Sequence, residues 1–331
     1  MALQGFTLIQ SPMAGGTTTA ELVSGACRAG ALGSIGAGYL SGQAVEEEIK
    51  AVRAKGADAF AVNLFIPASR RATAAEWQRA RQALEPCYQA AGVAMPEQFK
   101  EQAPFDEQFE AVLEARPAFF TFTFGRLPKD LIKACRARGV ALIGTATSRN
   151  EALALADDGV DAIVLQGEEA GGHCGSANPH AAAQPLATLL AECRDIDKPL
   201  IAAGGIMDGV DLARAMEQGA AAGQLGTAFL RCPEAGCAEV WKQAIATAEP
   251  GCTALTLAVS GRYARGIANA WMDQRAPADP APYPDQNRLT SPLRKAAGVE
   301  WKSLWAGTGV HRSRALPVVE LVAAIEAERR A

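Results

Sequence analysis

The chain has 331 residues, of which 49% are hydrophobic and 21% are charged, and its formal net charge is −4. This composition is typical of a folded globular protein with a large core, and the slight negative charge argues against nucleic acid or an anionic membrane surface as a partner. The N-terminus lacks the basic and apolar parts of a signal peptide, and no run approaches the roughly 18 uncharged apolar residues of a membrane helix, so we expect a cytoplasmic protein.

Short apolar segments with the character of parallel strands recur along the chain. They lie at residues 8–13, 32–38, 58–65, 119–124, 141–147, 162–167, 199–205 and 223–229. Such segments are apolar on both faces because helices cover both sides of a parallel sheet.

Helices are predicted between these strands, most clearly at residues 43–55, 128–138, 148–157 and 208–218. The helix at 148–157 begins with Ser148 and has Glu151 three residues later, a spacing that predicts a capping box. Eight strands, most of them followed by a helix, favour an α/β fold of the (β/α)8 TIM barrel type over a doubly wound sheet.

Two long segments interrupt this repeat. Residues 68–116 contain a predicted helix of their own at about 73–92, and residues 261–316 contain a proline-rich run from Pro277 to Pro292. We expect the two segments to form a smaller, mostly helical substrate or cap domain over one end of the barrel. The barrel is then expected to comprise residues 1–67, 117–260 and 317–331, with a closing helix at the C-terminus.

The eight cysteines are scattered and contain no CxxC pair. In a chain of this length without a secretion signal they are expected to be reduced core residues. A zinc cluster could be drawn from His173, Cys174 and His180 with two neighbouring glutamates, but the spacing matches no standard ligand pattern. We therefore expect no metal, and no Cys174–His173 nucleophile pair, because adjacent residues seldom point at one another.

Glycines concentrate at the ends of the last two predicted strands, where a TIM barrel carries its active site. Gly204 and Gly205 end one strand, and Gly226 and Thr227 follow the next. Glycine allows backbone amides to approach a phosphate closely, and loops 7 and 8 are the usual phosphate site of this fold. The alternative is that these glycines only form tight turns.

His173 is one of three histidines and lies among Gly171, Gly172 and Gly175 after the sixth predicted strand. An imidazole with an ordinary pKa of about 6.5 can take or give a proton at neutral pH, which makes His173 the candidate catalytic residue. It could also be a surface histidine without a role, the interpretation that we favour for His180 and His311.

Three side-chain amides also lie at strand ends. Asn63, Gln166 and Gln224 could hydrogen-bond the carbonyl and N–H groups of a flavin ring, because an amide both donates and accepts. Alternatively, they bond the backbone of neighbouring loops.

The sequence resembles the nitronate monooxygenases, an FMN-dependent family formerly called 2-nitropropane dioxygenases. The resemblance runs over almost the whole chain, and the segments that carry it are IQSPMAGGTTTAELV, GAGYLSGQAVEEEI, AVNLFIP, VLQGEEAGGHCG, AAGGIMDG, QLGTAFL, GRYARGIAN and LWAGTGV. The GAGYLS segment is similar to that of the stricter, nitronate-oxidising class.

The resemblance implies FMN at the top of the barrel. The positions that match cofactor contacts are Asn63, Gln166, Gly171, Gly205 and the run Gln224, Leu225, Gly226 and Thr227, with Met13 beside the isoalloxazine. His173 matches the active-site histidine, as base for a nitroalkane or anchor for a nitronate. Cys174 departs from the family, where arginine is more usual, which puts the affinity for anions in doubt.

The implied reaction is the oxidation of an alkyl nitronate by O2 to a carbonyl compound and nitrite through a flavin semiquinone. Two alternatives stay open: an NAD(P)H-dependent FMN reductase acting on a quinone or an enoyl thioester, and a non-redox barrel enzyme that binds a phosphate. Further candidates for the pocket are Tyr39, Tyr88, Tyr263, Tyr283 and Lys302. A homo-oligomer is compatible with the sequence, which does not specify one.

Overall fold

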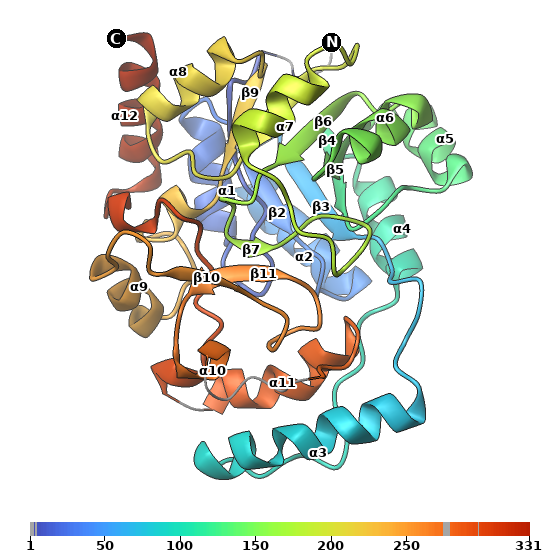
Figure 1. Cartoon of the computed structure of the whole chain (residues 1–331). Coiled ribbons are helices and arrows are strands. Elements are labelled where there is room, and N and C mark those ends of the chain that lie inside the picture. The colour runs from blue at the N-terminus through green and yellow to red at the C-terminus, as the bar shows by residue number, and fades with distance from the viewer. Residues whose placement is uncertain (1–2, 4, 274–278, 297) are drawn as a thin grey trace.

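An eight-stranded parallel sheet forms the centre of the computed structural model, which describes residues 3, 5–273, 279–296 and 298–331 (Figure 1). Its strands are β1 (Leu8–Gln10), β2 (Ser34–Gly36), β3 (Ala61–Phe65), β4 (Phe119–Thr123), β5 (Ala141–Ala146), β6 (Ala162–Gln166), β8 (Leu200–Ala203) and β9 (Ala222–Leu225). The order β1-β9-β8-β6-β5-β4-β3-β2 is that of a barrel.

The barrel closes between β1 and β2. The Leu32 amide donates to the Leu8 carbonyl at 2.9 Å, and the Gln10 amide donates to the Leu32 carbonyl at 2.9 Å. These bonds join the two ends of the sheet, so the predicted TIM barrel is confirmed.

Helices cover the outside of the barrel, as Figure 1 shows for α7, α8 and α12. They are α1 (Ala20–Arg28), α2 (Gly42–Ala54), α4 (Phe105–Ala115), α5 (Lys129–Ala137), α6 (Arg149–Asp158), α7 (Leu186–Cys193), α8 (Gly209–Glu217) and α12 (Val318–Arg330). Their apolar faces and the outward side chains of the strands form the main core, which includes Val45, Ile49 and Leu321. The described residues contain no helix that is long and apolar enough to cross a membrane.

Several strands end earlier than predicted, and the first and last of the barrel are shortened most. β1 stops at Gln10 because Ser11–Met13 turns across β2, where a Cβ on Gly36 would lie only 2.7 Å from the Met13 carbonyl carbon. β9 stops at Leu225, and residues Thr227–Phe229 form the 3-10 helix η1 instead. Both changes place loop backbone at the C-terminal end of the barrel, where the sequence places the active site.

The predicted capping box at α6 forms only in part. The Glu151 amide donates to the Ser148 hydroxyl at 3.3 Å, as expected. The Glu151 carboxylate does not return to Ser148, however. It accepts from the Thr147 amide at 2.8 Å and from the Ser176 hydroxyl at 2.7 Å. Glu151 therefore ties α6 to the loop that follows His173.

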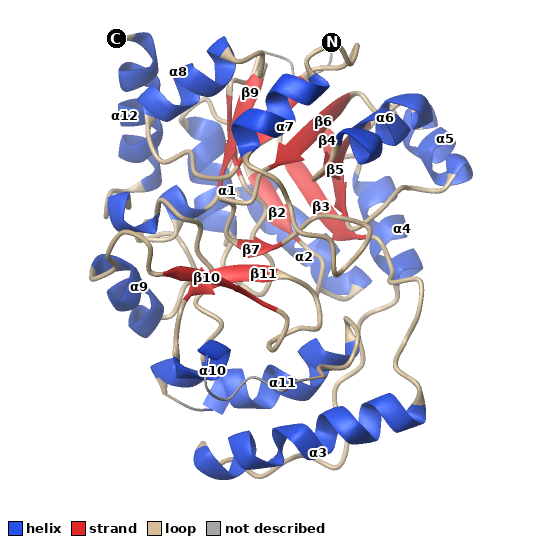
Figure 2. Ribbon diagram, in the orientation of Figure 1, coloured by secondary structure: helices blue, strands red, loops and turns tan. Residues whose placement is uncertain are grey.

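Beyond the barrel lies a second layer that contains a small antiparallel sheet of β10 (Thr253–Thr256), β11 (Ala264–Ile267) and β7 (Gly172–His173). The other elements there are α3 (Ala74–Ala90), α9 (Glu239–Ala246), α10 (Ala270–Asp273), α11 (Asp285–Ala296), η2 (Val299–Trp301) and η3 (Val310–Arg312). Figure 2 shows the sheet between the barrel and helices α10 and α11, with α3 outermost. The sequence did not predict this sheet, since its strands have only two to four residues.

The division into a barrel and a cap domain stays a prediction, and the packing suggests where its boundary falls. α3 and α11 share a separate apolar cluster with Trp271 and Trp301, as a cap would. α4, however, packs its Phe109 and Val112 into the main core, so we propose that the first cap segment ends before residue 105. Pro277, at the start of the proline-rich run, lies outside the described residues.

Candidate active site

A cavity of about 790 Å³ opens at the C-terminal ends of the barrel strands. This volume lies within the range of roughly 300–1,000 Å³ that is usual for small-molecule sites. The structure brings every site residue predicted from the sequence to its lining: Met13, Asn63, Gln166, Gly171, His173, Gly204, Gly205, Gln224, Leu225, Gly226 and Thr227.

One end of the cavity is made of backbone. Gly205, the second residue after β8, has a φ of 72°, which favours glycine. In the described part of the chain, the amides of Gly205, Gly226 and Thr227 donate to no other group. Free amides in glycine-rich loops and at the start of a helical turn are suited to a phosphate group.

The segment that follows Trp305 also contributes to this glycine-rich end of the cavity. The sequence did not predict a role for this segment. The Gly307 amide donates to the Thr227 hydroxyl at 2.9 Å. A Cβ on Gly171 would lie 2.4 Å from the Gly307 nitrogen, so glycine is required for the two loops to meet. The LWAGTGV segment thus forms part of the wall, although no role was predicted for it.

The three amides predicted at strand ends have different surroundings. The Asn63 amide nitrogen donates to the hydroxyls of Thr121 and Thr123, which leaves its oxygen for a ligand. Gln224 has no side-chain hydrogen bond to any described residue and faces the same space. Asn63 and Gln224 could therefore bind the polar edge of a flavin ring.

Gln166 lines the cavity and also bonds the backbone of a loop, so its predicted contact with the cofactor stays a prediction. Its Nε2 donates to the His173 carbonyl at 3.2 Å, and its Oε1 accepts from the Gly175 amide at 2.6 Å. Both ends of the amide thus bond the loop that carries His173.

His173 lies on β7, where its backbone pairs with Ala264 of β11. Its Nε2 is buried and has no hydrogen-bond partner within the described residues. Burial, and then the charges of Arg262 and Arg294, lower the pKa of His173 to about 3. The imidazole of the unliganded chain is therefore neutral at neutral pH, and the ordinary pKa assumed from the sequence is wrong for this environment.

Two guanidinium groups flank this histidine, and the sequence analysis identified neither. Arg262 is 2% exposed, and its guanidinium carbon lies 4.0 Å from the centre of the Phe124 ring. Arg294 of α11 lines the cavity and donates to the Thr290 hydroxyl at 2.6 Å and to the Asn287 side-chain oxygen at 2.9 Å. Within the described chain, neither arginine forms an ion pair with a carboxylate.

Cys174 points away from the cavity. Its thiol donates to the Ala181 carbonyl at 3.5 Å, and its amide donates to the Tyr263 carbonyl at 2.7 Å. Arg262 reaches the same loop, donating to the Ser176 carbonyl at 2.5 Å. Cys174, which stands where the family more usually has arginine, thus places no side chain in the cavity. Arg262 supplies a cation close to the same loop.

The other histidines and cysteines lie apart from His173. His180 is exposed, and its amide donates to the Asn178 side chain at 3.0 Å, whereas His311 is exposed on η3. The described cysteines form no disulfide. Among the described residues, no three His, Cys, Asp or Glu side chains are grouped so that they could hold a metal ion.

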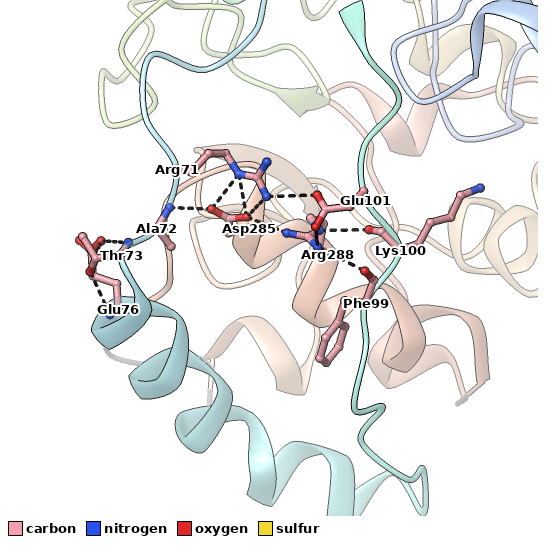
Figure 3. A network of polar contacts seen from close by, with 9 residues as sticks. All are labelled: Arg71, Ala72, Thr73, Glu76, Phe99, Lys100, Glu101, Asp285 and Arg288. Atoms are coloured by element: carbon pink, nitrogen blue, oxygen red, sulfur yellow. Dashed lines mark hydrogen bonds and ion pairs between the residues drawn. The ribbon is translucent and has the colours of Figure 1, made fainter.

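The rim of the cavity is fixed by an ion-pair network (Figure 3). Asp285, whose side chain is 3% exposed, accepts from Arg71 at 2.5 Å, from the Ala72 amide at 2.6 Å and from Arg288 at 3.1 Å. Arg288 also donates to the Lys100 carbonyl at 3.0 Å, so the network ties the rim segment 98–102 to α11. Burial raises the pKa of Asp285, but these hydrogen bonds and the Arg71 charge lower it overall.

Of the five further pocket candidates, two lie at or beside the cavity and three lie elsewhere. Tyr39 lines the cavity, and Tyr283 is buried beside His173, with 5.7 Å between the ring centres. Tyr88 instead donates to the Leu289 carbonyl at 2.7 Å inside the α3–α11 cluster. Tyr263 lies in a small side pocket, and Lys302 caps the end of α11 by donating to the Arg294 carbonyl at 2.6 Å.

Known proteins resemble this chain over most of its length. A family model described as nitronate monooxygenase matches residues 3–328. A nitronate monooxygenase of Paraburkholderia phytofirmans is 38% identical over 97% of this chain and 91% of its own, and a probable nitronate monooxygenase of Staphylococcus aureus is 35% identical over 97% and 93%. The structure of a nitroalkane oxidase from Streptomyces ansochromogenes is similar with a TM-score of 0.94 and 34% identity, covering 100% of this chain and 98% of that one.

Proposed function

Because the chain belongs to the nitronate monooxygenase family, we propose that it oxidises alkyl nitronates, the anions of nitroalkanes, with molecular oxygen and a bound FMN. The proposed products are a carbonyl compound and nitrite. When bound, FMN would accept electrons from the nitronate and pass them to oxygen. The residues of the chain would bind the anion, orient it and exclude water.

The observation that carries this proposal is the pair of unneutralised cations beside His173. Arg262 and Arg294 have no carboxylate partner in the described chain, and both lower the pKa of His173. A cation taken out of water without a counter-ion is costly, and an anionic ligand reduces that cost. The nitronate anion suits this environment better than the neutral nitroalkane does.

Several other residues that line the cavity fit FMN. Gly205, Gly226 and Thr227 would hold the phosphate through their free amides, and Asn63 and Gln224 would bind polar atoms of the ring. The Met13 sulfur comes within 3.7 Å of the point that a Cβ on Gly226 would occupy, so it would lie beside the bound cofactor. Gly171, Gly204 and Leu225 would shape the same wall.

We propose that His173 acts as a neutral group that orients the anion. A base with a pKa of about 3 is weak, so removal of the α-proton of a nitroalkane would be slow. A preformed nitronate has no such proton to lose. Its oxygen atoms could instead bond with the imidazole, whose Nε2 lacks a partner in the described chain.

Oxygen uptake with nitrite release tests this function. The FMN-loaded protein should consume oxygen and release nitrite with ethyl nitronate and should respond far less to neutral nitroethane added from an acidic stock. Nitrite should form in parallel with oxygen loss. Absence of nitrite with several alkyl nitronates would overturn the proposal.

A further inference from the structure

Unpartnered buried polar atoms gather around His173. Eight side-chain polar atoms of the described residues are buried without a hydrogen bond of good geometry, and four of them belong to Tyr39, His173, Arg262 and Tyr283. A buried polar group without a partner is costly, so native structures keep few of them. Four in one place indicate that something absent from the chain itself bonds with them.

A continuous set of aromatic contacts holds the two tyrosines in place. The Tyr39 ring lies 5.3 Å from that of Phe65, which lies 4.6 Å from that of Phe124. The Phe124 ring in turn lies 6.0 Å from His173 and 5.5 Å from Tyr283. Both hydroxyls are thus carried by rings with little freedom to turn, and the Tyr283 ring lies beside the imidazole.

The two tyrosines have different access to the cavity. Tyr39 contributes to its lining, whereas Tyr283 is 4% exposed and lies behind the lining. The hydroxyls are close enough for each to influence the pKa of the other: burial raises both pKa values, and the Tyr283 hydroxyl lowers that of Tyr39. Tyr283 therefore stands where its O–H can donate to the Tyr39 oxygen.

The charge in this part of the wall is positive. Tyr39 and Arg294 both line the cavity, and the charges of Arg262 and Arg294 oppose the rise that burial causes in the pKa of Tyr39 and of Tyr283. The Arg262 guanidinium carbon lies 5.5 Å from the centre of the Tyr283 ring. Such surroundings favour an anion over a neutral molecule of the same shape.

We propose that the Tyr39 hydroxyl donates a hydrogen bond to one oxygen of a planar two-oxygen anion held against His173, and that Tyr283 is a positioning residue that donates to Tyr39. The inference rests on the proposed function, in which that anion is the nitronate. It adds that a small carboxylate, which has the same two oxygens on a planar centre, occupies the same place and competes with the substrate.

Three single substitutions of tyrosine by phenylalanine test this inference in the FMN-loaded enzyme. Tyr39→Phe and Tyr283→Phe each remove an unpartnered hydroxyl. Tyr88→Phe is the matched control, because it removes a buried hydroxyl that donates to the Leu289 carbonyl outside the cavity. The probes are propionate and neutral propionamide, with binding followed by the change in flavin absorbance, and the KM for ethyl nitronate is measured alongside.

We expect Tyr39→Phe to weaken propionate binding about tenfold to a hundredfold, the usual effect of losing a hydrogen bond to a charged group. Its KM for ethyl nitronate should rise similarly, and its affinity for propionamide should stay within about twofold. Tyr283→Phe should weaken propionate binding by a smaller factor. Tyr88→Phe should leave propionate binding unchanged.

Thermal unfolding without propionate separates this role from a structural one. Tyr39→Phe and Tyr283→Phe should each lower the melting temperature by less than Tyr88→Phe does, because their two hydroxyls have no hydrogen bond of good geometry to any other described group. Tyr88→Phe should melt at a lower temperature, because the Leu289 carbonyl loses its donor.

Several results would overturn the inference. They are unchanged propionate binding in Tyr39→Phe, equal weakening in Tyr88→Phe, or no propionate binding by the unsubstituted enzyme. Failure of the proposed function looks different: the unsubstituted enzyme then binds propionate through Tyr39 but does not oxidise nitronates. If nitronates are oxidised and Tyr39→Phe leaves their KM unchanged, the function stands and this inference fails.

Discussion

Gln166 holds His173 by its backbone: the Gln166 amide nitrogen donates to the His173 carbonyl at 3.2 Å, while the amide oxygen accepts from Gly175 at 2.6 Å. The end of strand β6 thus fixes both sides of the loop that carries the candidate catalytic residue. Glu151 supports the same loop from α6 through Ser176. The position of His173 therefore depends on bonds made by the neighbouring backbone, because its own Nε2 has no partner in the described chain.

Replacing Gln166 by methionine keeps the side-chain volume and removes both bonds to the loop. We expect kcat/KM for ethyl nitronate to fall about tenfold or more, because two buried backbone groups lose their partners and the loop loosens. Steady-state kinetics and the FMN content after gel filtration check this. FMN content should fall only in part, because the Gln166 amide lines the cavity with one N–H and one lone pair unused by the loop, whereas the backbone amides and the other polar side chains of the cavity remain. Loss of FMN with normal kinetics in the reconstituted enzyme would contradict this role.

His173→Asn tests whether the imidazole orients an anion or acts as a base. We expect kcat/KM for ethyl nitronate to fall about tenfold, because one hydrogen bond to a charged ligand is lost, and kcat/KM for neutral nitroethane to fall by no more than that. Paired oxygen-uptake assays with the two substrates measure the two factors. A sharp loss with nitroethane and normal turnover of the nitronate would instead establish the base.

The lowered pKa of His173 also predicts how stability depends on pH. Below about pH 6.5 the unfolded chain binds a proton at His173, whereas the native chain does so only near pH 3. The contribution of His173 to the free energy of unfolding is therefore fully present above pH 6.5 and is lost as the pH falls toward 3. Urea unfolding at pH 7 and at pH 5 should show a smaller loss of unfolding free energy in His173→Asn than in the unsubstituted chain. If the unfolding free energy falls equally in the two chains, the pKa of His173 is not lowered in the native state.

The barrel could be predicted from sequence because local patterns determine it. Apolar strands alternate along the chain with capped amphipathic helices, and this alternation predicts the fold. In a TIM barrel the C-terminal ends of the strands all lie on one face. Glycines at Gly204–Gly205 and Gly226 could be placed at that face for the same reason. All the site residues predicted in this way line the one cavity.

The rest of the site depends on contacts between residues that are far apart in the sequence, which local patterns do not predict. Arg262 lies just before β11 and Arg294 on α11, both far along the chain from His173, and Gly307 meets Thr227 across 80 positions of sequence. The pKa of His173 follows from burial by these same segments. The small sheet has strands too short for alternation to predict, although it fixes the backbone of His173.

The rim network predicts a stabilising role for Asp285. Asp285→Asn removes the charge between Arg71 and the nearly buried Arg288, and we expect the unfolding free energy to fall by about 1–3 kcal/mol. Urea unfolding measures the change. Glu46→Gln is the control, because it breaks the exposed pair with Lys50 and should change stability by less than about 0.5 kcal/mol. Equal effects of the two substitutions would show that the network adds no more than a surface ion pair.

Electron transfer from a nitronate to the flavin is the property that distinguishes the proposed oxidase from a reductase. Anaerobic mixing of the FMN-loaded protein with ethyl nitronate, and separately with NADPH, tests this transfer most directly through the absorbance of oxidised flavin near about 450 nm. We predict rapid loss of that absorbance with the nitronate and none with NADPH on the same time scale. Rapid bleaching by NADPH with no response to the nitronate would contradict the account and identify a reductase.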